Sequence, residues 1–160
     1  MKLALLIWLL AAIVQDGRER RVRNGFVLTG AALALLAVAL DLQPFGLRGP
    51  EVLLGGAVAF GGLLCFYAFG LMGAGDVKFA GALGLWVGMQ PLLPIWVVAS
   101  LLAGLHGLLW LVLQRWHVAP RLALALSGRP GDHGRRPRPI PLAAYLAVAT
   151  IAFMASGLGT

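Results

Sequence analysis

Long apolar stretches set the strongest limit on how this chain can fold. The stretches are separated by short polar segments and cover residues 3–14, 26–40, 52–72, 79–89, 91–113 and 140–157. A helix needs about 20 residues to cross a bilayer, so the third, fifth and sixth stretches are long enough. The chain is 60% hydrophobic and 12% charged, and a water-soluble core of this size cannot hide that much apolar surface. The sequence therefore predicts an all-α integral membrane protein, a bundle of about six transmembrane helices forming a single domain over residues 1–160.

The break between the fourth and fifth stretches decides the number of helices. As one helix, residues 79–113 would be about 50 Å long, well beyond the ~30 Å thickness of the hydrocarbon layer. Gln90, Pro91 and Pro94 interrupt this region, and proline kinks or ends a helix. We therefore expect two helices here.

The basic residues test this division, because Lys and Arg collect on the cytoplasmic side of membrane proteins. With six crossings, only Lys2 and Arg48 fall outside. The opposite side holds the other basic residues, which are Arg18, Arg20, Arg21, Arg23, Lys78, Arg115, Arg121, Arg129, Arg135, Arg136 and Arg138. Merging the two stretches would move the last arginine-rich loop outside and break the rule. We expect six helices with both termini outside the cytoplasm.

Several other readings are weaker. The net charge of +7 does not indicate nucleic-acid binding, because the basic residues interrupt apolar stretches instead of alternating with exposed aromatic residues. Residues 3–14 match the length of a signal peptide, but no convincing cleavage site precedes the basic segment that follows. Cys65 is the only cysteine, which excludes an internal disulfide and a multi-cysteine zinc site, and we interpret it as a packing residue. Ala80, Gly84 and Gly88 recur every four residues and favour close approach of another helix.

The carboxylates are few: Asp16, Glu19, Asp41, Glu51, Asp76 and Asp132. Asp16 directly follows the first predicted helix, and Asp76 begins the fourth, so both can face one cavity at the cytoplasmic border. Such a pair suggests acid–base chemistry on a membrane-embedded substrate. The alternative is that each is a solvated helix terminus, with Asp76 stabilised by the helix dipole.

Two glycines favour the chemical interpretation. Gly73 and Gly75 leave the backbone before Asp76 uncovered and free to take unusual torsions, so an extended peptide can pair with it. A peptide bond inside a transmembrane helix is shielded from water, and a protease must unwind its substrate and give the freed backbone new partners. The segment GAGD alone remains a weak motif.

Together these segments resemble the type IV prepilin peptidases, membrane aspartic proteases that carry D-x5-(I/V)-P-N after the first helix and GxGDxK(F/L) later. In DGRERRVRN, Asp16 is followed by Val22 at the aliphatic position and by Asn24, with Arg23 where the family usually has proline. The second motif is matched by Gly73, Gly75, Asp76, Lys78 and Phe79. Pro141 resembles the proline at the entry to the family's last helix.

The resemblance implies a membrane-embedded aspartic endopeptidase of the bacterial inner membrane, whose active site faces the cytoplasm and removes the leader peptide from prepilins. It implies Asp16 and Asp76 as catalytic residues and Gly73, Gly75, Lys78 and Asn24 as substrate-binding residues, with no metal or cofactor. The implied partners are a transmembrane prepilin, the lipid bilayer and, as an option, further copies of the chain. Paired CxxC motifs of the bifunctional members are missing, as in the short enzymes of tight-adherence (Flp) pilus systems, so we expect no N-methyltransferase activity.

The helix ends suggest separate roles within the pair. Asp16 at a helix C-terminus would keep the proton, and Asp76 at a helix N-terminus would act as the base. Competing readings are a presenilin-like protease, a serine protease, and a small non-enzymatic transporter or assembly scaffold in which the aspartates couple ions. The first two lack their motifs here. His106, inside a predicted helix, is expected to bond between helices more than to catalyse.

Overall fold

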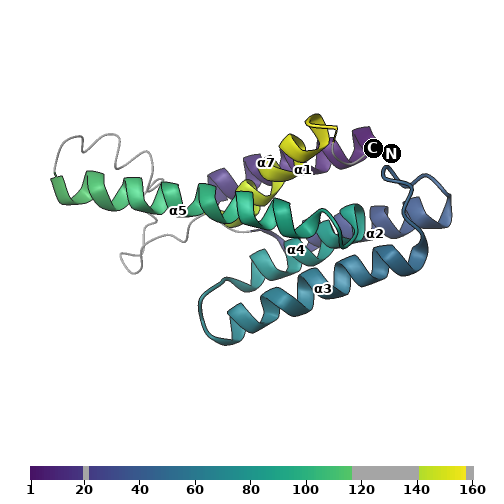
Figure 1. Ribbon diagram of the computed structural model, residues 1–160, viewed down its shortest axis with the longest axis horizontal. Coiled ribbons are helices and arrows are strands. Elements are labelled where there is room, and N and C mark those ends of the chain that lie inside the picture. The colour runs from purple at the N-terminus through teal and green to yellow at the C-terminus, as the bar shows by residue number, and fades with distance from the viewer. Residues whose placement is uncertain (20–21, 117–140, 158–160) are drawn as a thin grey trace.

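The computed structural model describes residues 1–19, 22–116 and 141–157, and this part of the chain is helical without strands. Its helices are α1 (Lys2–Glu19), α2 (Asn24–Ala39), α3 (Gly49–Ala68), α4 (Ala74–Val87), α5 (Leu92–Trp116) and α7 (Leu142–Ala155). Each overlaps one apolar stretch of the sequence, although α3 ends four residues before the third stretch does and α4 begins five residues before the fourth (Figure 1). The all-α prediction is confirmed. The arginine-rich loop and Asp132 lie outside the described residues.

Two of these helices are long and apolar enough to cross a membrane, at Gly49–Ala68 and Leu92–Val112. Only 28% of the apolar window in α3 and 17% of that in α5 is buried inside the protein. A core helix of a soluble protein would be mostly buried, so these exposed apolar sides are compatible with contact to lipid. The remaining crossings stay predictions.

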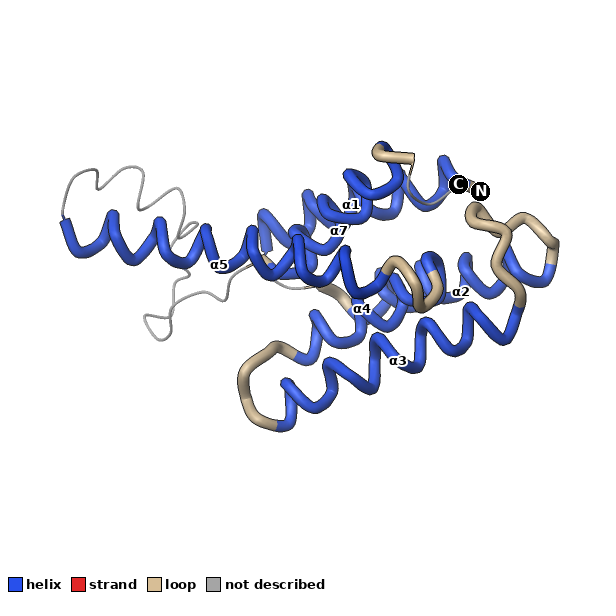
Figure 2. Tube along the Cα trace, in the orientation of Figure 1, coloured by secondary structure: helices blue, strands red, loops and turns tan. Residues whose placement is uncertain are grey.

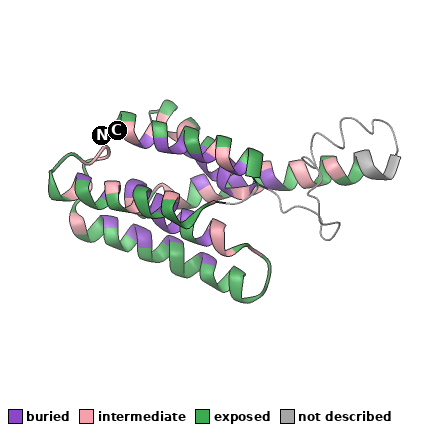
Figure 3. Ribbon diagram, turned by 180° about the vertical axis from the view of Figure 1, so that it is seen from behind, coloured by how far each residue is buried: buried purple, intermediate pink, exposed green. Residues whose placement is uncertain are grey.

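The helices form two groups, and α4 links them because it belongs to the first and also contacts α7 of the second. One group pairs α3 with α4 and packs α2 against α4, and the other packs α1 and α5 against α7. Figure 2 shows α4 between α3 and the pair made by α1 and α7, and the C-terminal part of α5 extends beyond the other helices. Buried residues lie on the sides of the helices that face inward, while α3 is exposed along most of its length (Figure 3).

The short helix α4 is the centre of the protein. Its side chains Val77, Phe79, Leu83 and Trp86 are almost completely buried. Leu5 of α1 is fully buried as well, as are Leu9 and Ala12, so the first helix is an integral part of the core. Burial of α1 supports its assignment as a helix of the bundle.

Glycines allow the close contact between α3 and α4. A Cβ atom placed on Gly55 would lie 2.5 Å from the carbonyl oxygen of Gly84 and 2.6 Å from Cα of Gly88. The predicted close approach at Gly84 and Gly88 is therefore confirmed, and Ala80 is buried in the same helix. α4 ends where Gly88 takes a φ of +71°, a conformation that glycine adopts without strain.

Two sequence predictions need correction. The split between the fourth and fifth stretches is confirmed, but Pro94 does not contribute to it, because it lies in the first turn of α5, where a missing N–H costs nothing. Cys65 is exposed on the protein surface, and its thiol only contacts the carbonyl of Gly61 at 3.7 Å. Its interpretation as a packing residue is wrong.

Candidate active site

Asp16 lies within α1, three residues before the end of the helix at Glu19. The sequence placed it directly after the helix, because the apolar stretch stops at Val14. Hydropathy marks the limit of the apolar segment, whereas backbone hydrogen bonding does not depend on it, and the good helix formers Gln15, Arg18 and Glu19 surround Asp16 and Gly17. The Asp16 side chain is only 3% exposed, which makes it the one buried carboxylate in the described part of the chain.

Asp76 lies in the first turn of α4, and Gly73 is the N-cap residue with φ −77° and ψ 144°. The freedom of the glycines to take unusual torsions is not used here, because neither Gly73 nor Gly75 has a positive φ and Gly75 is already helical. The glycines instead leave space. A Cβ atom on Gly73 would lie 3.2 Å from Oδ2 of Asp76, whereas one on Gly75 would lie 3.9 Å from the backbone of Val22.

The first turn of α7 brings the two aspartates together. The backbone N–H of Ala144 donates to Oδ2 of Asp16 at 2.9 Å, and the backbone N–H of Ala143 donates to the carboxylate of Asp76. The two carboxylates are close enough for the charge of Asp16 to act on Asp76. The first amides of a helix lack partners within it and form its positive end, so they suit a negatively charged pair. Three helices, α1, α4 and α7, thus converge on one acidic site.

This geometry removes the basis for assigning the acid and the base to particular aspartates. The sequence assigned the proton to Asp16 and the basic role to Asp76 from the opposite polarity of their own helix ends. Both carboxylates in fact meet the same positive end of α7. The helix dipoles therefore do not separate their roles, and the pair is best treated as one titrating unit.

Asn24 and Lys78 form a second, separate cluster. Nζ of Lys78 donates to Oδ1 of Asn24 at 3.1 Å, which joins α4 to the first turn of α2. Lys78 is therefore turned toward α2, while Asp76 is turned toward α1 and α7. The structure brings Asp16, Asp76 and Gly73 together and leaves Asn24 and Lys78 on another side of α4.

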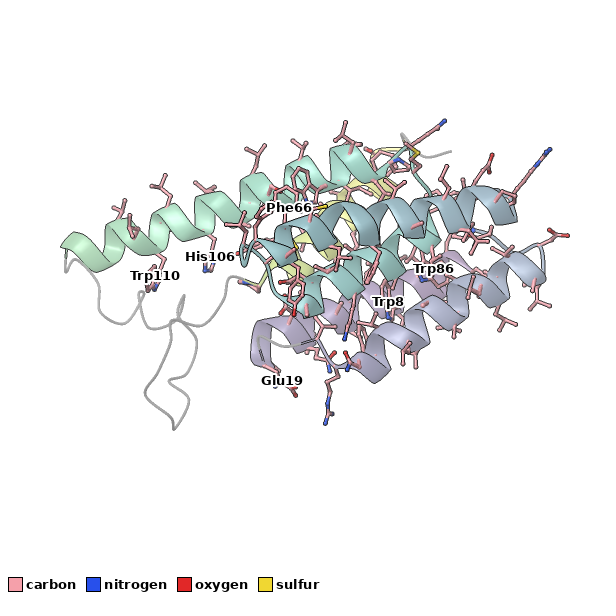
Figure 4. The ribbon with its side chains drawn as sticks, turned by 90° about the horizontal axis from the view of Figure 1, so that it is seen from below. Trp8, Glu19, Phe66, Trp86, His106 and Trp110 are labelled. Atoms are coloured by element: carbon pink, nitrogen blue, oxygen red, sulfur yellow. The ribbon has the colours of Figure 1, made fainter. Side chains whose placement is uncertain are left out.

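Trp8 was missed by the sequence analysis, although it fixes α1 on the helices of the site. Its indole stacks on Phe26 at a centroid distance of 5.6 Å and on Phe79 at 4.9 Å, and its Nε1 donates to the carbonyl of Phe26 at 3.2 Å. The side chain points into the interior between the helices (Figure 4). Phe79 belongs to the second motif, so its aromatic partner on another helix was the signal to look for.

His106 of α5 bonds to α7, as the sequence predicted. Its Nδ1 lies 2.7 Å from the hydroxyl of Tyr145, and the two rings meet edge to face with centroids 5.9 Å apart. Tyr145 directly follows Ala144, the residue whose amide binds Asp16. The contact therefore holds α7 next to the site. Among the described residues, no group of three or more His, Cys, Asp or Glu side chains could hold a metal ion.

The protein is an apolar helical bundle with two adjacent carboxylates where three helices meet, and comparison with known proteins identifies its family. A sequence model of the type IV leader peptidase family matches residues 3–108, which include both Asp16 and Asp76. The chain belongs to the type IV leader peptidase family. The resemblance seen in the sequence motifs is confirmed.

One curated relative is the prepilin leader peptidase/N-methyltransferase of Xanthomonas campestris pv. campestris. It is 36% identical over 78 residues, which are 49% of this chain and 21% of the relative. The match thus spans about a fifth of the relative's length. No solved structure matches the chain.

Proposed function

We propose that this protein is an aspartic endopeptidase that removes the leader peptide from Flp-type prepilins without methylating the product. The observation that carries the proposal is the convergence of Asp16 and Asp76 on the first turn of α7. Membership of the leader peptidase family supports a prepilin as the substrate. The missing CxxC motifs support peptidase activity alone, since Cys65 is the only cysteine.

The mechanism uses the pair as a unit. Two adjacent carboxylates do not both ionise readily, so they share one proton. The ionised carboxylate removes a proton from a water molecule, whose oxygen attacks the scissile carbonyl carbon, while the protonated carboxyl group donates to the carbonyl oxygen. As the resulting diol collapses and the C–N bond breaks, the leaving amine takes a proton from the protonated carboxyl group, and a diol hydroxyl gives its proton to the ionised carboxylate, which restores the pair. No covalent enzyme intermediate is formed.

The N-terminus of α4 is the proposed binding site for the unwound peptide. Gly73 caps this helix and has no side chain that can accept from its first amides, so those of Ala74 and Gly75 have no N-cap side chain as a partner. The carbonyl oxygens of an extended substrate backbone can accept hydrogen bonds from these amides in place of a cap, next to Asp76. Asn24 and Lys78 complete the proposed substrate-binding set at the edge of α2.

We place the enzyme in the bacterial inner membrane with six crossings and the paired aspartates at the cytoplasmic border. The exposed apolar sides of α3 and α5 support the membrane location, and the uneven distribution of basic residues supports the orientation.

The test is direct cleavage. Membranes containing the wild-type protein are incubated with a candidate Flp-type prepilin, and the product is analysed by mass spectrometry, with membranes containing Asp76→Asn as the control. We expect a shortened pilin with an unmodified N-terminus, even with S-adenosylmethionine present. A transporter or scaffold would yield no shortened product, and a methylated N-terminus would contradict the single activity.

A further inference from the structure

A groove lies on the side of α4 that faces away from the two aspartates. It has a volume of about 620 Å³ and runs between α2 and α3, with α4 beneath. Its walls are apolar side chains such as Leu28 and Leu53, both largely exposed. Its base includes Ala82 and, where α3 and α4 meet, Gly56 and Gly81, which the side chains of Leu85 and Phe60 already cover. Ala31 and Ala57 keep the walls low, and small residues let a further helix come close, which is how helices associate in lipid.

The groove has one polar end. Asn24 and Lys78 line it there, joined by their 3.1 Å hydrogen bond. Along α4 the groove extends from Lys78 to Leu85, which is about 10 Å or two helical turns at ~1.5 Å per residue. Its shape and lining fit an apolar helix whose end lies at the level of Lys78.

We propose that this groove binds the apolar transmembrane helix of the prepilin, which the family resemblance implies comes directly after the leader peptide. The inference rests on the proposed peptidase function and adds the place where the substrate is held. Lys78 comes two residues after Asp76, so the polar end of the groove and the catalytic pair lie at the same end of α4. The two sites differ in direction, because Lys78 faces α2 and Asp76 faces α1 and α7.

The position of the groove dictates the form of the bound substrate. To reach the pair of aspartates from the groove, the peptide must pass around the N-terminus of α4, a helix about 10 Å across. An extended chain covers ~3.3 Å per residue, so about three to five unwound residues separate the docked helix from the scissile bond. The uncapped first turn of α4, with Gly73 and Gly75, lies on this route. A prepilin helix docked in the groove can therefore reach the pair only if the residues before it are unwound.

Photocrosslinking tests the docking directly. Benzoylphenylalanine replaces Leu53 in the groove or, as a matched control, Leu101 on α5, which is 68% exposed and does not line the groove. Both proteins also carry Asp76→Asn, so that uncleaved prepilin accumulates. We expect the Leu53 position to crosslink to the apolar segment of the prepilin at least about fivefold more than the Leu101 position. Equal yields at the two positions, or adducts with lipid alone, would overturn the proposal.

A blocking variant gives an independent measurement in active protein. Ala57 lines the groove and Ala32 is an exposed residue of α2 that does not, so Ala57→Phe is compared with Ala32→Phe. Ala57→Phe should raise the KM for prepilin on the order of tenfold with kcat nearly unchanged, whereas Ala32→Phe should leave both constants near wild type. An unchanged KM in Ala57→Phe counts against the groove.

The same experiments separate the two proposals. If wild-type membranes cleave the prepilin but Leu53 gives no specific crosslink, the docking proposal fails and the proposed function stands. If wild-type membranes do not cleave the prepilin, the proposed function fails and the docking proposal falls with it. Thermal unfolding of Ala57→Phe in detergent checks that the variant is folded.

Discussion

The backbone amide of Ala144 donates a 2.9 Å hydrogen bond to Oδ2 of Asp16, across 128 residues of sequence. The neighbouring amide, that of Ala143, serves Asp76 in the same way. Helix α7 lies beyond residues 3–108, the part of the chain that matches the leader peptidase family, yet it completes the site. The acidic site therefore depends on the C-terminal helix as well as on the two aspartate motifs.

The first prediction concerns the pair itself. Asp16→Asn and Asp76→Asn should each lower prepilin cleavage on the order of 10³-fold or more, because each removes a group that must hold or accept a proton. Cleavage rates in membranes with equal amounts of inserted protein measure this. The control is Asp41→Asn, an exposed residue with a φ of 52° that asparagine also tolerates, and it should cleave at close to the wild-type rate.

The double variant Asp16→Asn/Asp76→Asn extends this test. Residues that act as a unit are strongly non-additive, so the double variant should be no slower than either single variant. Near-normal turnover in either single variant would remove the two-aspartate mechanism for this chain.

The second prediction separates the two motif glycines. A methyl group on Gly73 would lie 3.2 Å from Oδ2 of Asp76, so Gly73→Ala should displace the carboxylate by a few tenths of an ångström. A preorganised site tolerates about 0.5 Å, so this displacement uses much of the tolerance, and we expect a loss in kcat of about threefold. Gly75→Ala places its methyl group in ordinary contact with the backbone of Val22 and should lose much less. A larger effect at Gly75 would mean that its uncovered backbone, and not space beside Asp76, is what the motif provides.

The helices were predictable because polar, glycine or proline residues separate the apolar stretches. The site was predictable only in part. Spacing identified Asp16 and Asp76, since both stand where an apolar stretch meets a charged one. The amides of Ala143 and Ala144 carry no sequence signal, because every residue except proline has such an amide and only the packing of α7 brings these two to the aspartates. Tertiary contacts of this kind also account for Trp8, whose partner Phe79 is distant in the sequence.

The third prediction tests the contact between α3 and α4. Gly55→Ala would press a methyl group against the backbone of Gly84 and Gly88, where no side chain can move aside. We expect a loss of about 1–3 kcal/mol in the free energy of unfolding, the usual cost of overpacking. Gly62→Ala in the same helix meets nothing within 4 Å and should unfold at or slightly above the wild-type temperature. Equal unfolding temperatures in detergent would show that the two helices separate easily at Gly55.

The fourth prediction assigns a structural role to the contact between α5 and α7. Tyr145→Phe keeps the ring but removes the hydroxyl that lies 2.7 Å from Nδ1 of His106. Loss of this hydrogen bond should cost about 1 kcal/mol of stability and leave kcat within about threefold of wild type. Thermal unfolding and prepilin cleavage are measured on the same preparation. A loss of activity as large as that of Asp16→Asn would instead give the hydroxyl a part in the chemistry.

The fifth prediction concerns whether α4 crosses the membrane. Its 14 residues span about 21 Å at ~1.5 Å per residue, less than the ~30 Å hydrocarbon thickness, but its side chains are covered by neighbouring helices and need not match the lipid. Alkaline phosphatase, which is active only outside the cytoplasm, is fused after Gly46, in the turn between α2 and α3, or after Gly131 in the arginine-rich loop. We expect activity at Gly46 and none at Gly131, because three crossings separate the two positions. Equal activity at both positions would mean that only two helices cross between them. The helix that does not cross would then be α4, because it alone in that interval is too short to span the bilayer unaided. It would stay on the cytoplasmic side with Asp76.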